Sequence, residues 1–477
     1  MYYRLAEPYA FRGYKGLPYA IRAEQGRKLF DRPLFFGKES FLALLYCNGT
    51  EPVEPEALDE KTRAALQELL SRGILTASEA PMEPLKSYQR YRVYPSRYLD
   101  KVHWSITGRC NFRCRHCLVS APDGRHPEPS LEQCLDVIRQ LEACGVHRVD
   151  VTGGEPLVRR DCDVLFRALS EHRIFIGTIF TNASLLTGEV LDQLEKYGHH
   201  PAFQLSFDGL GCHDWLRGVP GAEQQADAAF HLLRERGFAA TAAMCLHRKN
   251  KGSLRDTANY LARNGVHLLR VNAPQELGIW KQYAQEYALT RQERWEVYRD
   301  YIPRYFEDGM PIDLQLDGYF SCKRGSTDYK VPFVHRAPEN ADWSRLPYCE
   351  AMQHTAYISP EGHLLPCMGF ADSPVDQACP SVFQQPLGEL SQKSHYADLV
   401  ATKLSDLLAK DAECARCPHL HSCCGGCMQE SMTEDGDYLV RDQEACWFFK
   451  NVGEAAVRAV ADAAIARHAL LRGTEGA

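Results

Sequence analysis

The chain has 477 residues and a formal net charge of −7, so its length predicts about three domains and its charge offers no basic surface for nucleic acid. No apolar run approaches the roughly 18 residues that a membrane span needs, and the first residues lack the charged-then-apolar layout of a secretion signal. Nineteen cysteines in a long chain without such a signal indicate a cytoplasmic metal-binding protein rather than a secreted disulfide-bonded one. We therefore expect neither a nucleic-acid partner nor a membrane partner.

Residues 1–79 predict a separate N-terminal domain. Aromatic-rich extended pieces over 13–21 and 28–36 precede a helix over 38–46, a second helix over 59–72 and a wing strand at Ile74-Leu75. This order resembles the winged-helix element that recognises precursor peptides in enzymes that modify ribosomally made peptides. The resemblance implies a domain that adds the peptide's leader as an extra strand on a sheet edge, although a structural or DNA-binding winged helix has the same pattern. Residues 80–100 contain three prolines and predict an ordered linker.

Residues 101–318 predict a regular alternation of strands and helices. Ser130 and Gln133 form a capping-box pattern at the start of the first of these helices. Six strands that alternate with helices predict a parallel sheet with right-handed crossovers, with the chemistry at the carboxyl ends of the strands. Strands are expected over 102–106, 146–151, 174–180, 203–207, 239–246 and 268–271, and helices over 130–145, 160–172, 187–197, 221–237 and 254–265.

Cys110, Cys114 and Cys117 follow the first of these strands at C-x3-C-x2-C spacing. Three thiolates from one loop can hold three irons of a [4Fe–4S] cluster and leave the fourth iron open to a small molecule. A zinc knuckle is the alternative, but zinc sites commonly take four ligands. The spacing resembles the signature of the radical S-adenosylmethionine (SAM) enzymes, and His116 also fits that pattern. The resemblance implies a partial (β/α)6 TIM-like barrel in which these catalytic cysteines hold a cluster whose open iron chelates SAM.

Polar residues at the ends of the later strands fit the same family. The resemblance implies that the loop Thr152-Gly-Gly-Glu-Pro156 receives the SAM amino group, that the ends of the third and fourth strands approach SAM, and that Arg217 pairs with its carboxylate. Each of these side chains, taken alone, could equally be a helix cap or a surface ion pair. The expected SAM contacts are Gly153, Gly154, Glu155, Pro156, Thr181, Asn182, Ser206, Asp208, Arg217 and, as a weaker candidate, Asn272.

A second group of cysteines spans residues 349–446, after a bridging region at 319–348. Cys349 is followed by twelve residues, a glycine, four residues and Cys367. A run at C-x2-C-x5-C-x3-C spacing starts at Cys414 and ends at Cys427. Eighteen residues then separate Cys427 from Cys446. This spacing resembles the seven-cysteine SPASM domain, whose last gap is one residue shorter. That domain carries two auxiliary [4Fe–4S] clusters, while two structural zinc sites are the alternative. The resemblance implies an outer cluster on Cys414, Cys417, Cys423 and Cys446 and an inner cluster on Cys349, Cys367 and Cys427, with Cys322 or an open iron in the fourth place. Residues 447–477 predict a terminal amphipathic helix.

The resemblance implies an enzyme with three [4Fe–4S] clusters that cleaves SAM to a 5′-deoxyadenosyl radical, with electrons from a reductant such as flavodoxin or ferredoxin. The radical would take a hydrogen atom from a precursor peptide that is bound through its leader. A thioether cross-link is the first choice of product, and a carbon–carbon or carbon–oxygen cross-link is next. An epimerase that uses a thiol such as Cys212 or Cys245, a sulfatase-maturing enzyme that makes formylglycine, and a peptide-binding iron–sulfur electron-transfer protein stay open as alternatives.

Overall fold

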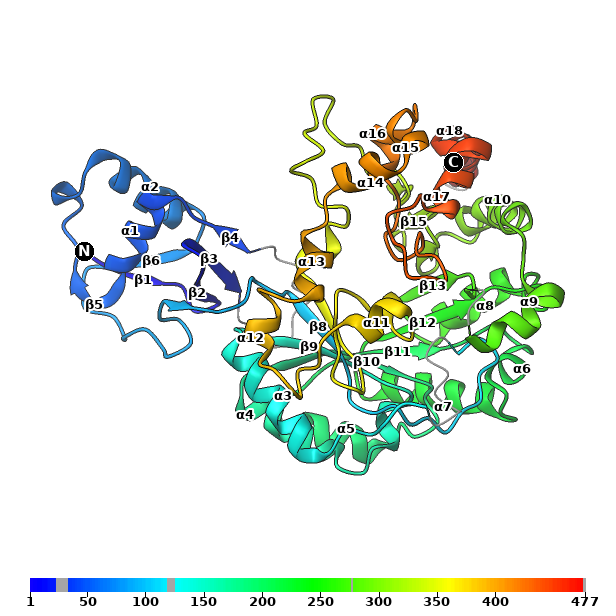
Figure 1. Ribbon diagram of the computed structural model, residues 1–477, viewed down its shortest axis with the longest axis horizontal. Coiled ribbons are helices and arrows are strands. Elements are labelled where there is room, and N and C mark those ends of the chain that lie inside the picture. Colours follow the sequence, from blue (N-terminus) through cyan, green and yellow to red (C-terminus); the bar gives the residue numbers. More distant parts are fainter. Residues whose placement is uncertain (23–32, 118–124, 276–277, 475–477) are drawn as a thin grey trace.

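The computed structural model describes residues 1–22, 33–117, 125–275 and 278–474, so part of the extended piece expected over 28–36 lies outside the described residues. Figure 1 shows a small N-terminal unit beside a large α/β unit, with a region of short helices on one side of the large unit. None of the described helices combines the length and the apolar character that a bilayer span requires.

The N-terminal unit contains two small sheets and two helices. In the first sheet, β1 (Tyr2–Leu5) pairs antiparallel with both β5 (Asn48–Pro52) and β6 (Leu75–Ser78). The second sheet has the order β4-β3-β2-β7 and is made of β4 (Leu34–Phe35), β3 (Leu17–Arg22), β2 (Tyr9–Tyr14) and β7 (Arg92–Val93). Helices α1 (Lys38–Tyr46) and α2 (Glu60–Ser71) complete the unit. Side chains from both helices and both sheets share one apolar cluster that is separate from the core of the large unit, so the unit has a core of its own.

The large unit is built on one sheet in which strands β8 to β14 lie parallel and in chain order. The described strands of this sheet are β8 (Lys101–Ser105), β9 (Arg148–Thr152), β10 (Phe175–Thr181), β11 (Ala202–Ser206), β12 (Ala240–Cys245), β13 (Leu268–Asn272), β14 (Asp313–Leu316), β15 (Phe320–Cys322), β16 (Tyr329–Lys330), β17 (Thr355–Ile358) and β18 (Leu364–Leu365). Its register pairs Ser105 with Thr152 and Cys245 with Asn272. The polar residues that end these strands therefore meet at one edge of the sheet.

Helices connect consecutive parallel strands, as the sequence predicts. They are α3 (Leu131–Ala143), α4 (Cys162–Glu171), α5 (Gly188–Lys196), α6 (His213–Arg217), α7 (Ala222–Glu235), α8 (Leu254–Arg263), α9 (Lys281–Tyr287) and α10 (Arg291–Glu307). The capping box at α3 is present: Ser130 Oγ accepts from the Gln133 amide at 3.1 Å, and the Gln133 side chain accepts from the Ser130 amide at 2.8 Å. The predicted α/β fold class is confirmed.

The sheet is wider than the six strands that the sequence predicts. β14 adds a further parallel strand beyond β13, and β17 pairs parallel with β8 at the other side of the sheet. These strands have four residues each, which is too short for the alternation of polar and apolar residues to be recognised in the sequence.

Residues 349–474 consist mostly of short helices. They are α11 (Pro374–Ala378), α12 (Leu387–Leu390), α13 (His395–Ala401), α14 (Leu404–Lys410), α15 (Ala412–Ala415), α16 (Leu420–Cys423), α17 (Gln443–Asn451) and α18 (Gly453–Thr474). The single terminal helix expected over 447–477 is wrong, because α17 starts earlier and Gly453, with φ of +69°, separates it from α18. α18 lies against α10, and the Tyr329 hydroxyl donates to Asp462 at 2.7 Å (Figure 1).

Candidate functional site

The loop that carries Cys110, Cys114 and Cys117 leaves β8 at the carboxyl edge of the sheet and is held by backbone hydrogen bonds on two sides. The amide of Arg115 donates to the Leu216 carbonyl at 2.9 Å, and the amide of Glu155 donates to the Arg109 carbonyl at 2.9 Å. Burial raises the pKa of Cys110 to about 12, and the charges of Cys114 and Cys117 contribute to the shift. The three thiols are therefore neighbours, on a loop whose shape is set by α6 and by the turn after β9.

The two glycines of the turn after β9 lie against this loop. A Cβ on Gly154 would lie 2.3 Å from the Arg109 carbonyl oxygen, and a Cβ on Gly153 would lie 2.5 Å from the Thr107 carbonyl oxygen. These glycines are expected SAM contacts, and the structure gives a further reason for glycine at both positions, since they admit the backbone that leads into the cysteine loop. Any side chain at either position would push the two loops apart.

Glu155 is fully buried and joins the turn after β9 to the end of β10. Its carboxylate accepts from the Thr181 hydroxyl at 2.8 Å, the Asn182 amide at 2.6 Å and the Leu157 amide at 3.1 Å. Burial raises the pKa of Glu155 to about 7, although these three donors favour the charged form. Asn182 also donates to the Asn111 side chain at 2.9 Å, which ties the same corner to the cysteine loop.

Asp208, just after β11, is fully buried and holds Arg217 of α6. Arg217 Nε donates to Asp208 Oδ2 at 2.7 Å, and Arg217 Nη1 lies 3.8 Å from the Cys114 sulfur. Burial alone would raise the pKa of Asp208, but the charge of Arg217, the hydrogen bond and charge of His213 and the charge of His116 together outweigh burial and hold that pKa well below the usual range. The guanidinium thus lies between a buried carboxylate and a cysteine of the loop.

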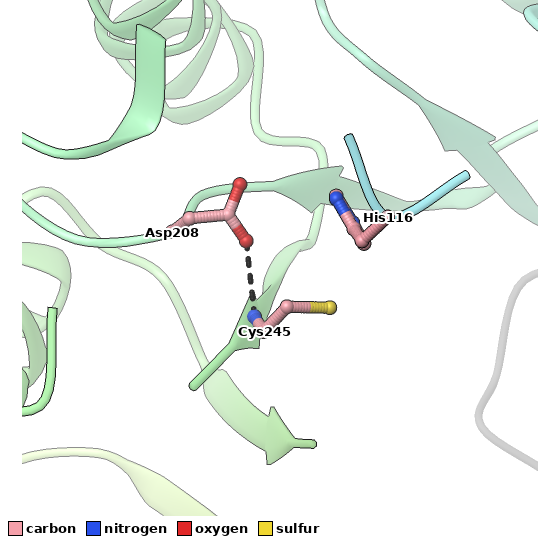
Figure 2. A group of neighbouring side chains, drawn as sticks. All are labelled: His116, Asp208 and Cys245. Atoms are coloured by element: carbon pink, nitrogen blue, oxygen red, sulfur yellow. Dashed lines mark hydrogen bonds between the residues drawn. The ribbon is translucent and has the colours of Figure 1, made fainter. Parts of the chain in front are cut away.

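Figure 2 shows His116, Asp208 and Cys245 converging from the cysteine loop, from the segment after β11 and from the end of β12. One ligand atom from each lies within 4.8 Å of the others, and the Cys245 amide donates to Asp208 Oδ1 at 3.0 Å. This trio could hold a single cation, but Arg217 already neutralises the carboxylate. The three side chains therefore offer no separate ion site and belong to the same edge of the sheet as the cysteine loop.

The other expected SAM contacts line the same edge. Pro156 and Thr181 are buried, and Ser206 and Asn272 are partly exposed at the ends of β11 and β13. The carboxyl ends of strands β9 to β13 thus surround the cysteine loop. The structure gathers all of the SAM-contact candidates at this edge; which of them touch SAM stays a prediction.

The four cysteines of the expected outer cluster are neighbours. Burial raises the pKa of Cys414 to about 12, with contributions from Asp411, Cys446 and Cys417, and raises that of Cys423 to about 12, with contributions from Cys446 and Cys414. Asp442 connects this group to the inner one, since it accepts from the Cys427 amide at 2.9 Å and caps the helix that carries Cys446.

The three cysteines of the expected inner cluster are also neighbours. Burial raises the pKa of Cys367 to about 11 and that of Cys427 to about 12, and the charge of Cys349 contributes to both shifts. The structure does not bring Cys322 to this group. Its thiol is buried on β15, donates to the Ser326 carbonyl at 3.1 Å and interacts with Tyr305 and Asp328 of the same region.

The spacing within the cysteine groups distinguishes a cluster from a single ion. The ligands of one zinc ion lie about 4 Å apart, because each zinc–sulfur bond is about 2.3 Å long. Within the described ranges, the trio at His116 is the single group of three potential ligands whose atoms all lie within 4.8 Å of one another. No three thiols of one cysteine group in the described ranges therefore lie as close together as the ligands of a single zinc ion do.

Sequence reasoning missed Glu430, Gln275 and Asp317, which lie near the inner cysteines. Gln275 donates to Glu430, whose pKa burial raises to about 7 with a contribution from Asp317. A local signal was present in the sequence, since Glu430 follows Cys427 by three residues. Gln275 and Asp317 have no such signal, because they come from distant parts of the chain.

Comparisons with known proteins agree with this geometry. Residues 104–261 match the family model described as the radical SAM superfamily. AdoMet-dependent heme synthase of Oleidesulfovibrio alaskensis is 22% identical over 366 residues, which cover 72% of this chain and 85% of that protein. Mycofactocin maturase MftC of Mycobacterium tuberculosis is 27% identical over 339 residues, covering 68% of this chain and 77% of that protein.

Among solved structures, Streptococcus suis SuiB bound to precursor peptide SuiA has a TM-score of 0.65 and 17% identity, and the match covers 93% of this chain and 99% of SuiB. A coverage of 93% leaves fewer residues unmatched than residues 1–79 contain, so part of the N-terminal unit belongs to the shared fold. The matched family model begins in β8 and includes the cysteine loop, the turn after β9, Asp208 and Arg217. Members of this superfamily bind a [4Fe–4S] cluster and SAM, and residues 104–261 of this chain form a radical SAM domain.

Proposed function

We propose that this enzyme modifies a ribosomally made precursor peptide, and that it forms a cross-link within that peptide. The observation that carries the proposal is the N-terminal unit with its own core, part of which falls within the fold match to SuiB bound to its precursor peptide. The similarity to the maturase MftC supports the same class of substrate. A porphyrin-like substrate, as in the heme synthases, gives no role to the N-terminal unit.

The residues at the carboxyl edge would perform the binding and positioning. Cys110, Cys114 and Cys117 would hold the cluster, and the strand-end residues from β9 to β13 would enclose SAM. When bound, the cluster and SAM supply one-electron chemistry that removes a hydrogen atom from an unreactive carbon. Arg217, which Asp208 holds in place, would present a planar cation to the SAM carboxylate or to the cluster.

The seven cysteines between residues 349 and 446 would hold two further [4Fe–4S] clusters. Their part would be to accept an electron when the substrate radical forms a new bond, because bond formation from two hydrogen-bearing atoms is a net oxidation. Anaerobically reconstituted protein should contain about twelve irons per chain, since each cube has four. A value near four, accompanied by two zinc ions, contradicts the auxiliary clusters.

The leader of the peptide would add to the N-terminal unit as a strand. β4 is an end strand of its sheet among the described residues, and its Phe35 is 58% exposed. Strand addition draws affinity from main-chain hydrogen bonds and specificity from side-chain contacts. Holding the leader there would raise the concentration of the core peptide near the barrel.

A paired substitution tests the leader site. Phe35→Asp should slow modification of a dilute precursor by about tenfold, the cost of about 1.4 kcal/mol in leader binding, and should leave SAM cleavage without peptide unchanged. Val93→Asp is the matched control, because Val93 is 60% exposed on β7 at the opposite end of the same sheet. Equal rates for the two variants, or equal rates on the precursor and on a leaderless peptide, contradict the proposal.

The mass of the treated peptide identifies the reaction. The probe is a candidate precursor peptide, chosen from any short reading frame found beside the gene and incubated with reconstituted enzyme, dithionite and SAM. A cross-link removes two hydrogen atoms, whereas an epimerase leaves the mass unchanged in water and adds one deuterium in heavy water. A thioether blocks a cysteine of the peptide, and a carbon–carbon or carbon–oxygen bond leaves it free. Conversion of Cys or Ser to formylglycine supports a sulfatase-maturing type and is detected by its aldehyde, because the loss of two hydrogen atoms from Ser has the same mass as a cross-link. Absence of 5′-deoxyadenosine supports an electron-transfer protein.

A further inference from the structure

The inner group of Cys349, Cys367 and Cys427 has three thiols, whereas a cubane cluster has four irons. The unassigned cysteines of this region are engaged elsewhere, and Cys379 is buried with Asp376 as its charged neighbour. Cys322 is directed at Ser326, and Cys424, which has φ of +50°, lies within 3.8 Å of the His421 carbonyl. The fourth position must therefore be filled by another kind of ligand or left open.

Glu430 lies on the turn that starts at Cys427. The Ser431 amide donates to the Cys427 carbonyl at 3.0 Å, so residues 427–431 form one helical turn. Side chains three positions apart on such a turn share a face. The carboxylate of Glu430 acts electrostatically on the thiols of both Cys367 and Cys427, and the Glu430 amide donates to the Cys427 sulfur. The carboxylate therefore lies one turn from Cys427 and within electrostatic range of two of the three inner thiols.

Within the described part of the chain, Glu430 also differs from its acidic neighbours in having no cation. Asp317 has Arg294 at 3.8 Å, and Glu444 pairs with Arg291 at 2.6 Å and with Arg294. Asp442 accepts from three backbone amides. Glu430 has the side-chain amide of Gln275, and its charged neighbours are Asp317, Asp442 and Glu444. The Glu430 side chain is exposed, and the negative charges around it favour a cation at this position.

We propose that the carboxylate of Glu430 is the fourth protein ligand of the cluster held by Cys349, Cys367 and Cys427. This inference rests on the proposed auxiliary clusters and adds an oxygen ligand to them. A carboxylate is a harder and more exchangeable ligand for iron than a thiolate. The inner cluster would thus have one iron that differs from the other three.

The test uses the full-length chain with Cys110, Cys114 and Cys117 replaced by Ala, so that the two auxiliary clusters give the spectroscopic signal. This parent is compared after reduction with Glu430→Gln, Glu430→Cys and Glu434→Gln. Glu434 is the matched control, an exposed glutamate that pairs with Lys281 at 2.6 Å. Each protein is titrated with ¹³C-cyanide, and pulsed electron paramagnetic resonance reports carbon bound to an iron that lacks a protein ligand.

In Glu430→Gln, the ¹³C coupling should appear at a cyanide concentration at least about tenfold lower than in the parent, since a neutral amide is a poor iron ligand. Glu430→Cys should resist cyanide as well as the parent does, but its inner cluster should have a shifted reduction potential. Glu434→Gln should match the parent in cyanide resistance and in reduction potential. The inference is overturned if the parent binds cyanide as readily as Glu430→Gln, or if Glu430→Gln also resists cyanide. The iron content of the parent separates this failure from a failure of the proposed function. About eight irons per chain show that both auxiliary clusters are present, whereas a value near zero contradicts both the auxiliary clusters and the Glu430 ligand.

Discussion

The cysteine loop at residues 110–117 rests on a parallel sheet, whereas the cysteines of residues 411–446 lie on short helices and turns. Strands β8 to β13 beneath the loop contribute side chains with no exposed surface, such as Val102, Val149 and Phe203. In residues 411–442, the described apolar side chains that are buried are Cys414, Leu420 and Met428.

This difference concerns what holds each cysteine group together. Helices α15 and α16 have four residues each, too few to be stable alone. A segment with so little apolar burial is stabilised mainly by what its ligands bind. We infer that the sheet holds the first site in shape without metal, and that the second region depends on metal for its local fold.

The largest effect should come from single cysteine substitutions that separate the two regions by chemistry. Cys114→Ala should reduce SAM cleavage to less than about a thousandth of the wild-type rate, because a ligand of the SAM-binding cluster is lost. Cys417→Ala should keep cleavage within about threefold and lose at least about nine tenths of the product. The measurements are 5′-deoxyadenosine and modified peptide from the same reactions. Cys424→Ala is the matched control, because Cys424 lies beside the outer group without belonging to it. A normal product yield from Cys417→Ala would show that the outer cluster has only a structural role.

Removal of metal should separate the regions by stability. Chelation of iron should speed proteolysis within residues 411–442 by about a hundredfold, because local opening then costs little free energy. Cleavage within β8 to β13 should change by less than about threefold. Mass spectrometry of limited digests locates the cuts. Equal acceleration in both regions would show that the first site also depends on its cluster for folding.

The smallest expected effect concerns Glu155 and is measured on metal-free protein. Burial raises its pKa from 4.5 to about 7, so between these values the folded state holds a proton that the unfolded state has lost. The free energy of unfolding should therefore fall as pH rises from about 4.5 to about 7, by up to about 3 kcal/mol from this group. Glu155→Gln should remove that slope in urea unfolding at pH 5 and pH 7.5. An unchanged slope would show that Glu155 is solvated when metal is absent and that the sheet alone does not hold the site.

Most of the α/β unit follows from local patterns in the chain. The period of apolar residues and the capping box at Ser130 place α3 and the strands around it, because helix and strand periodicities depend on neighbouring residues. The same patterns did not reveal α6, whose five residues end at Arg217. Its position against the cysteine loop depends on hydrogen bonds between segments about a hundred residues apart.

The amino-acid sequence alone determined the two cysteine groups and the family, since the spacing of thiols within one loop limits what they can bind together. It also placed the polar residues at the strand ends, because parallel strands bring their carboxyl ends to one edge. The tertiary structure alone decided that Gly153 and Gly154 accommodate the cysteine loop, that Arg217 lies between Asp208 and Cys114, and that Cys322 is directed away from the inner cysteines. It also brought Glu430 within electrostatic range of Cys367. These contacts join residues far apart in the chain, and the direction of each side chain depends on packing that no local spacing records.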